Sequence, residues 1–121
     1  MKILENIDLE NKKSYFVYIL ECENGNYYTG YTNDIEKRFK THASGKGQGA
    51  KFTRSFKPKK IAACWQIAGE KNVAMKVEYF IKKHTRADKQ IFIKFPETLK
   101  EHFCAKLDAP AEISVYKTDF M

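Results

Sequence analysis

The sequence predicts one small domain of the α/β (α+β) class, with a three-stranded mixed sheet, an N-terminal antiparallel hairpin and flanking helices. Three observations support this prediction. Runs of aromatic and β-branched residues at 15–20, 27–32 and 61–68 are typical of strands. Segments with the 3.6-residue period of amphipathic helices follow the second and third runs. A chain of 121 residues is long enough to bury a modest core as one domain.

The first two runs predict the hairpin. They flank Asn24, Gly25 and Asn26, residue types that supply the positive φ a tight turn needs. An antiparallel pair built in this way places Tyr18 and Tyr28 on neighbouring strands. Burial statistics alone favour ordinary packing roles for both tyrosines, so the spacing predicts the hairpin without deciding what its tyrosines do.

The next segment, residues 33–43, has the pattern of a helix. Asn33 and Glu36 resemble a capping box, and Ile35 and Phe39 recur on one face. This face is predicted to be the side of the helix that packs.

Arg38 and His42 lie four residues apart and share one edge of this helix, beside its apolar face. Plain structural roles also fit the spacing. Arg38 would then be a surface arginine paired with Asp34, and His42 a cation at the C-terminal end of the helix. On spacing alone, these structural roles are favoured.

No acidic residue occurs from Lys37 to Gly69. A block of one charge this long repels itself unless an anion lies near it. The phosphate backbone of a nucleic acid is the natural candidate, and Phe52 or Phe56 would then lie against a base or sugar. The alternative is a solvated basic loop with both phenylalanines in the core. Because the span coincides with a net charge of +7, nucleic-acid binding is favoured. We assign the contacts to Lys46, Lys51, Arg54, Lys57, Lys59 and Lys60.

Residues 70–83 form a second predicted helix, with Val73, Val77 and Ile81 on its buried seam. Glu78 lies at the border of that seam. A carboxylate there either holds an ion or forms an exposed pair with Lys82, four residues later, and the spacing favours the pair.

Two shorter helices are predicted over 85–95 and 97–107, separated by Pro96. Residues 108–121 are mixed in character and either lack regular structure or add a short strand. The predicted organisation is therefore a polar lead-in at 1–13, a main domain at 14–95, and a C-terminal helical extension with a tail at 96–121.

Composition limits the class of protein. The sequence pI of about 9.3 favours an anionic partner. The three cysteines are far apart and form no C-x-x-C pair, which argues against a zinc site or a disulfide framework. The N-terminal stretch contains acids where a signal peptide needs an apolar run, and no apolar run reaches the roughly 20 residues of a membrane helix. We therefore expect a cytoplasmic protein with no membrane partner.

Taken together, several pieces resemble the GIY-YIG endonuclease family, and most closely its small, stand-alone bacterial subgroup of predicted nucleases. The resemblance covers residues 14–92 and depends on the order and spacing of short pieces. These pieces are Phe-Val-Tyr at 16–18, Tyr-Thr-Gly at 28–30, the stretch 33–42 with Arg38 and His42, Ser-Gly-Lys-Gly at 44–47, Lys-Phe-Thr-Arg at 51–54, and Glu78. Phe16 and Thr29 stand where the family name has Gly and Ile, which concerns packing rather than chemistry.

This resemblance implies a metal-dependent endonuclease that hydrolyses phosphodiester bonds in DNA. Glu78 would hold one Mg²⁺, with Mn²⁺ as a substitute. Arg38 would bind the non-bridging oxygens through its planar fork of donors. Tyr18 and Tyr28 would position the attacking water, and either of them would take its proton. His42 would orient the water or relay the proton.

Two other classes of function remain in view. One is a nucleic-acid-binding module, for DNA or RNA, that kept the site and lost turnover. The other is a purely structural or protein–protein role, which would show no salt-sensitive affinity for any polyanion. Glu78 separates the enzyme from the binder, because an enzyme needs its carboxylate and a binder tolerates Gln there.

Overall fold

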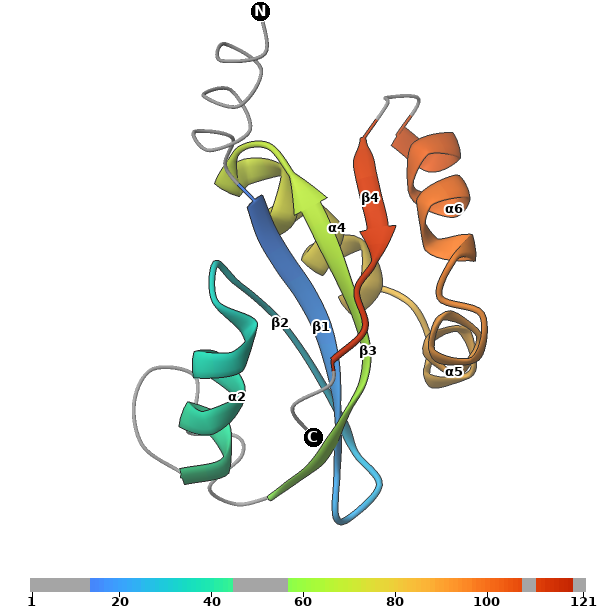
Figure 1. Cartoon of the computed structure of the whole chain (residues 1–121). Coiled ribbons are helices and arrows are strands. Elements are labelled where there is room, and N and C mark those ends of the chain that lie inside the picture. The colour runs from blue at the N-terminus through green and yellow to red at the C-terminus, as the bar shows by residue number, and fades with distance from the viewer. Residues whose placement is uncertain (1–13, 45–56, 108–110, 119–121) are drawn as a thin grey trace, which may run out of the picture.

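The computed structural model describes residues 14–44, 57–107 and 111–118. The predicted lead-in at 1–13 lies outside these ranges, as does most of the basic loop. None of the helices within them is long and apolar enough to cross a membrane. The predicted order of strands and helices is confirmed (Figure 1): β1 (Ser14–Cys22), β2 (Tyr27–Thr32), α2 (Ile35–Ser44), β3 (Pro58–Ala68), α4 (Lys71–Lys82), α5 (Arg86–Lys94), α6 (Thr98–Leu107) and β4 (Glu112–Val115).

The sheet has four strands in the order β2-β1-β3-β4. Each neighbouring pair is antiparallel, so the prediction of three strands in a mixed sheet is wrong on both points. The fourth strand comes from the C-terminal tail, where Glu112 pairs with Ala68 and Val115 with Trp65. A run of four residues is at the lower limit of the roughly four to eight alternating positions that indicate a strand, so the sequence left this strand as one of two alternatives for the tail.

The β1–β2 hairpin closes as its turn residues predict. Gly25 has φ +86°, and its N–H donates to the carbonyl oxygen of Cys22 at 2.9 Å. The Asn24 side chain accepts from the N–H of Asn26 at 3.1 Å. This turn sets a register in which Tyr18 lies opposite Gly30.

Helices cover both faces of the sheet (Figure 1). Side chains alternate along each strand, so Val17 and Ile19 point to one face and Tyr18 and Leu20 to the other. The first pair packs with residues of α4, α5 and α6, whereas the second packs with Ile35 and Phe39 of α2.

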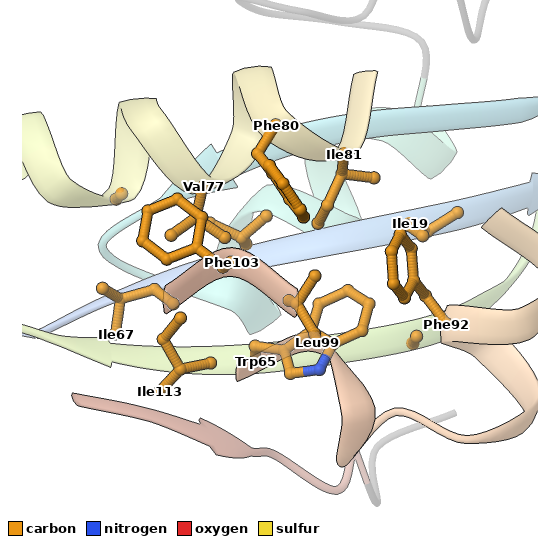
Figure 2. Close-up of a cluster of buried hydrophobic side chains, with 13 residues drawn as sticks. Ile19, Trp65, Ile67, Val77, Phe80, Ile81, Phe92, Leu99, Phe103 and Ile113 are labelled. Atoms are coloured by element: carbon orange, nitrogen blue, oxygen red, sulfur yellow. The ribbon is translucent and has the colours of Figure 1, made fainter. Parts of the chain in front are cut away.

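The larger core lies between the sheet and α4, α5 and α6 (Figure 2). Trp65 of β3 is completely buried there, and its indole N–H donates to the carbonyl oxygen of Pro96 at 2.8 Å. Leu99 and Phe103 of α6 and Ile113 of β4 belong to the same cluster. The C-terminal extension is therefore part of this core.

Candidate active site

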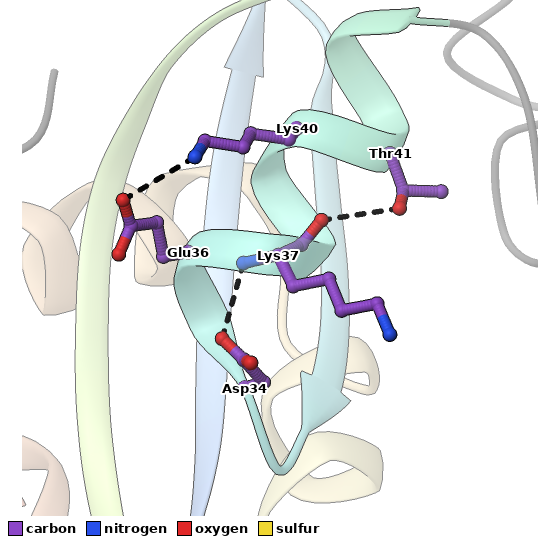
Figure 3. Close-up of polar contacts among 5 residues, drawn as sticks. All are labelled: Asp34, Glu36, Lys37, Lys40 and Thr41. Atoms are coloured by element: carbon purple, nitrogen blue, oxygen red, sulfur yellow. Dashed lines mark hydrogen bonds and ion pairs between the residues drawn. The ribbon is translucent and has the colours of Figure 1, made fainter.

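Helix α2 begins with a cap that fixes its orientation (Figure 3). The Asp34 carboxylate accepts the backbone N–H of Lys37 at 3.1 Å, and the Thr32 hydroxyl accepts the N–H of Asp34 at 3.1 Å. The cap is thus Asp34 rather than Asn33. Glu36 forms an ion pair with Lys40 at 3.5 Å on the exposed side of the helix.

His42 lies on the opposite, buried side of α2. Its side chain is 0% exposed, and its Nε2 is 2.9 Å from the Tyr18 hydroxyl. The Tyr28 ring packs against it edge-on, with ring centroids 4.9 Å apart. Burial, and then the charge of Arg38, lower the pKa of His42 to about 4. The imidazole is therefore neutral at pH 7, and the prediction of a helix-end cation is wrong.

Gly30 provides the space that Tyr18 occupies. A Cβ atom at this position would lie 2.5 Å from the Tyr18 hydroxyl oxygen and 3.2 Å from the Tyr28 ring. Such distances are shorter than van der Waals contact, so a larger residue would displace the Tyr18 ring. The Tyr-Thr-Gly sequence at 28–30 thus has a packing reason for ending on glycine.

A cavity of about 420 Å³ opens beside these residues. Residues from both faces of the sheet line this cavity, so it lies at the β2 edge of the sheet, between α2 and α4. Tyr18 and Tyr28 line it from the α2 face, Arg38 comes from α2 itself, and Glu78 reaches it from α4. Four of the five predicted catalytic residues therefore share one cavity, and His42 lies behind Tyr18. The remaining lining residues are Tyr15, Gly30, Tyr31, Thr32, Asn33 and Lys71.

Burial dominates the titration of both tyrosines. It raises the pKa of Tyr18 above its ordinary value, and the nearby Tyr28 and Glu78 raise it further. Burial and then Glu78 raise the pKa of Tyr28 as well. The nearby Arg38 acts in the opposite sense and lowers the pKa of both groups. Both phenols are accordingly protonated at neutral pH, with Arg38 as the positive charge that favours their ionised forms.

Glu78 forms the ion pair with Lys82 that the spacing favours, and it also lines the cavity. Its carboxylate is 3.4 Å from the Lys82 ammonium, and the two side chains are 17% and 50% exposed. The same carboxylate lines the cavity. Exposed pairs of this kind contribute at most about 1 kcal/mol, so the ion pair alone does not account for the position of Glu78.

The donor set of the cavity suits a hard cation with few protein ligands. Within the described ranges, no group of three or more His, Cys, Asp or Glu side chains is arranged around a common metal position. Glu78 supplies the carboxylate oxygens of the cavity lining. Mg²⁺ is often held by one or two carboxylates together with waters and substrate phosphates, and this arrangement fits that mode.

The model of the GIY-YIG catalytic domain matches residues 14–91. This chain belongs to the GIY-YIG family. It is 47% identical to the UPF0213 protein BH0048 of Halalkalibacterium halodurans over 64% of this chain and 79% of that protein. It is 38% identical to the UPF0213 protein YazA of Bacillus subtilis over 83% of this chain and 96% of that protein. The solution NMR structure of the UPF0213 protein BH0048 from Bacillus halodurans has a TM-score of 0.44 and 43% identity, covering 68% of this chain and 84% of that one.

The departures from the GIY-YIG name have packing explanations. The Phe16 ring contacts Tyr116, with centroids 4.8 Å apart, and the N–H of Tyr116 donates to the carbonyl oxygen of Cys64 at 2.9 Å. Thr29 is 5% exposed within β2. Phe16 thus packs against a segment that lies beyond the matched domain.

The basic residues predicted to bind nucleic acid are only partly described. Lys46, Lys51 and Arg54 lie outside the described ranges. Lys57, Lys59 and Lys60 lie at the hairpin-turn end of β3, where Lys60 approaches Glu21 at 3.9 Å. None of these three lines the cavity.

Lys71 is a cavity residue that the sequence reasoning missed. It lies seven residues, or about two helical turns, before Glu78, so both side chains share one face of α4. That spacing was the signal that could have identified it. Tyr15 and Tyr31 were also missed, because their strand positions point to the other face of the sheet from Tyr18.

Proposed function

We propose that this cavity hydrolyses phosphodiester bonds of DNA in a reaction that depends on a divalent metal ion. The observation that supports it most strongly is convergence. Tyr18 and Tyr28 from the hairpin, Arg38 from α2 and Glu78 from α4 line one cavity although sixty positions separate the first from the last. Membership of a family defined by a catalytic domain points in the same direction, and this family implies a nucleic-acid substrate.

Charge neutralisation is the first requirement of the reaction, because a phosphodiester is anionic and repels a nucleophile. Arg38 offers a planar, permanently charged set of donors for two non-bridging oxygens. Lys71 offers a second positive charge from α4. The scissile phosphate would therefore lie between α2 and α4, over the β2 edge.

Proton transfer is assigned to Tyr18 and His42. With Nε2 of the neutral His42 unprotonated, the Tyr18 hydroxyl would donate to it across the 2.9 Å contact, and a lone pair of the phenol oxygen would face a water in the cavity. As that water attacks phosphorus, its proton passes to Tyr18 while the Tyr18 proton passes to His42. The charge of Arg38 favours loss of the proton from Tyr18 and disfavours its retention on His42, so the imidazole would hold this proton only transiently. Tyr28 would orient the water.

Glu78 would hold the divalent cation, with Mg²⁺ as the natural ion and Mn²⁺ as a substitute. When bound, the ion supplies positive charge for the leaving oxygen and for the transition state. Glu78 is 17% exposed and faces the cavity, so waters and a phosphate oxygen can complete its coordination.

The test compares Glu78→Gln with Lys82→Gln. Both substitutions remove the Glu78–Lys82 ion pair, but only the first removes the carboxylate. We expect Glu78→Gln to reduce Mg²⁺-dependent cleavage of plasmid DNA to the rate measured in EDTA, while DNA retention in EDTA stays within twofold. Lys82→Gln should cleave at close to the wild-type rate. Equal losses in both variants would identify Glu78 as a structural ion-pair residue.

The same assay separates the enzyme from a binding module without turnover. A binding module retains DNA with salt-sensitive affinity and shows no cleavage in Mg²⁺ or Mn²⁺, and its affinity is unchanged in Glu78→Gln. A panel of duplex, branched, nicked and single-stranded DNA and RNA identifies the substrate class.

A further inference from the structure

The flank of α4 that faces away from the cavity forms one wall of a second concavity. This groove has a volume of about 750 Å³ and runs between α4 and α6. Val73 and Phe80 of α4 and Phe103 of α6 form its apolar part. Its size lies within the roughly 300–1,000 Å³ of ligand-binding clefts in general.

Three exposed lysines surround this apolar part. Lys76 lies on α4 and Lys83 is the C-cap of that helix, seven residues and about 10 Å further along its axis. Lys106 lines the groove from α6. None of the described lining residues is acidic. A concavity lined by one sign of charge concentrates anions of the opposite sign, so the groove is suited to a polyanion.

An exposed aromatic ring lies beside these charges. Tyr79 is 63% exposed, although a large ring of this kind is usually more buried. The Lys83 ammonium is 5.2 Å from the centroid of the Tyr79 ring. An aromatic face next to a lysine is the arrangement that binds a base by stacking and the adjoining phosphate by charge.

The groove and the cavity lie on two sides of α4 and are separated by that helix. Tyr79 follows Glu78 directly in the sequence, so a strand that leaves the cavity over Glu78 crosses one helix to reach Tyr79 and Lys83. A duplex presents phosphates along its length but keeps its base faces stacked inside. The exposed ring therefore selects single-stranded over double-stranded nucleic acid.

We propose that the groove between α4 and α6 binds a single-stranded flank of the nucleic acid whose scissile phosphate lies in the cavity. The substrate class is then a nucleic acid that is single-stranded on one side of the cleavage position. This inference rests on the proposed nuclease function for its biological meaning, but the groove itself is testable by binding alone.

The experiment measures binding in EDTA with the full chain carrying Glu78→Gln. The probes are fluorescein-labelled oligo(dT) and a blunt DNA duplex, followed by anisotropy across a series of salt concentrations. Combined replacement of Lys76, Lys83 and Lys106 by Ala should lower the log–log salt slope for oligo(dT) by about 2, since each phosphate contact to a single strand contributes about 0.7. The matched control replaces Lys94, Lys100 and Lys117, three exposed lysines outside the groove.

Tyr79→Ala tests the stacking part. It should weaken oligo(dT) binding about fivefold or more and leave duplex binding within twofold. Poly-glutamate is the competitor that reports on charge alone, and it should displace oligo(dT) far less well than unlabelled oligo(dT) does.

Three results would overturn the inference: an unchanged salt slope in the groove variant, an equal loss in the control variant, or equally good competition by poly-glutamate. An equal effect of Tyr79→Ala on both probes would overturn its single-strand part. Cleavage by the wild-type chain is scored separately. If the groove variant loses oligo(dT) binding and the wild-type chain does not cleave, the groove is supported and the nuclease function is refuted. If the groove variant keeps its binding and the wild-type chain cleaves, the nuclease function is supported and the groove is refuted.

Discussion

The two faces of the central sheet are built from different chemistry. The face covered by α4, α5 and α6 packs thirteen buried hydrophobic side chains into one cluster. The face covered by α2 has a smaller cluster of five, which includes Tyr18, and it also buries His42. The cluster on the first face is hydrophobic, whereas the second face carries a hydroxyl and an imidazole at its centre. We call the first the stabilising face and the second the chemical face, although Glu78 and Lys71 reach the cavity from α4.

Energetics explain why the polar pair can exist on the smaller face. Complete burial of an aliphatic or aromatic side chain contributes about 1.5–3 kcal/mol, and the larger cluster contains many of these. An unpartnered buried hydroxyl costs about 1–3 kcal/mol. The 2.9 Å hydrogen bond between Tyr18 and His42 offsets that cost. The hydrophobic core on the opposite face contributes most of the stability of the fold that holds this pair in place.

The largest predicted effect tests whether the C-terminal extension belongs to the stabilising face. Leu99→Ala removes a side chain that is 0% exposed and should lower the free energy of unfolding by about 2–5 kcal/mol. The neighbouring Lys100→Ala, on the exposed side of α6, should change it by less than about 0.5 kcal/mol. Urea unfolding measures both. A loss below 1 kcal/mol in Leu99→Ala would remove α6 from the core.

The second prediction concerns pH and the chemical face. The pKa of His42 is about 4 in the folded protein against 6.5 ordinarily, so the unfolded chain binds more protons between these values. Stability is therefore lost as pH falls from about 6.5 towards 4, by at most about 3 kcal/mol.

His42→Gln keeps a hydrogen-bonding partner for Tyr18 and removes this titration. The difference in unfolding free energy between pH 7 and pH 4.5 should shrink in that variant. It should stay unchanged in His102→Gln, since His102 is exposed. An acid-induced loss of the same size in wild type and His42→Gln would contradict the burial of a neutral imidazole.

A third, smaller effect is expected at the contact between the strands. Gly30→Ala places a Cβ against the Tyr18 hydroxyl and should cost about 1–3 kcal/mol through overpacking. In a Tyr18→Phe background the cost should be smaller, because the closest of the clashing atoms is gone. Thermal unfolding of the four proteins in this cycle measures the coupling, and strictly additive losses would show that the tyrosine ring is not held against Gly30.

The smallest predicted effect lies where the C-terminal segment meets the chemical face. Phe16→Ala and Tyr116→Ala should show a coupling energy of about 0.5–1.5 kcal/mol, the usual value for an edge-to-face aromatic pair. A double-mutant cycle in urea measures it. A coupling near zero would mean that Phe16 is accommodated in some other way.

Local signals in the sequence predicted most of the fold. The hairpin depends on Asn24, Gly25 and Asn26, and helix α4 on the seam of Val73, Val77 and Ile81, which are short-range patterns. Strand β4 was left as one of two alternatives for the tail, because its four residues are a minimal pattern and their pairing with β3 is a long-range contact. The cap was assigned to Asn33 instead of Asp34, since neighbouring capping residues are hard to distinguish before the chain geometry is known.

The candidate site was predicted by residue identity more fully than by geometry. The order of Tyr18, Tyr28, Arg38 and Glu78 singled out the residues that line one cavity. The full burial of His42 behind Tyr18 could not be predicted, because it depends on how α2 packs against β1. Lys71 was missed for a similar reason: its exposure to the cavity follows from the position of α4 at the β2 edge.

We propose that residues from the hairpin, α2 and α4 act together as one phosphodiesterase site. Single-turnover cleavage of DNA by Arg38→Ala, Tyr18→Phe and the Arg38→Ala/Tyr18→Phe double variant tests it most directly. We predict a loss of about 10²–10³-fold for Arg38→Ala, and a double variant scarcely slower than the worse single one, because groups that act as a unit are not additive. Independent losses that multiply, or cleavage unaffected by either substitution, would contradict the account.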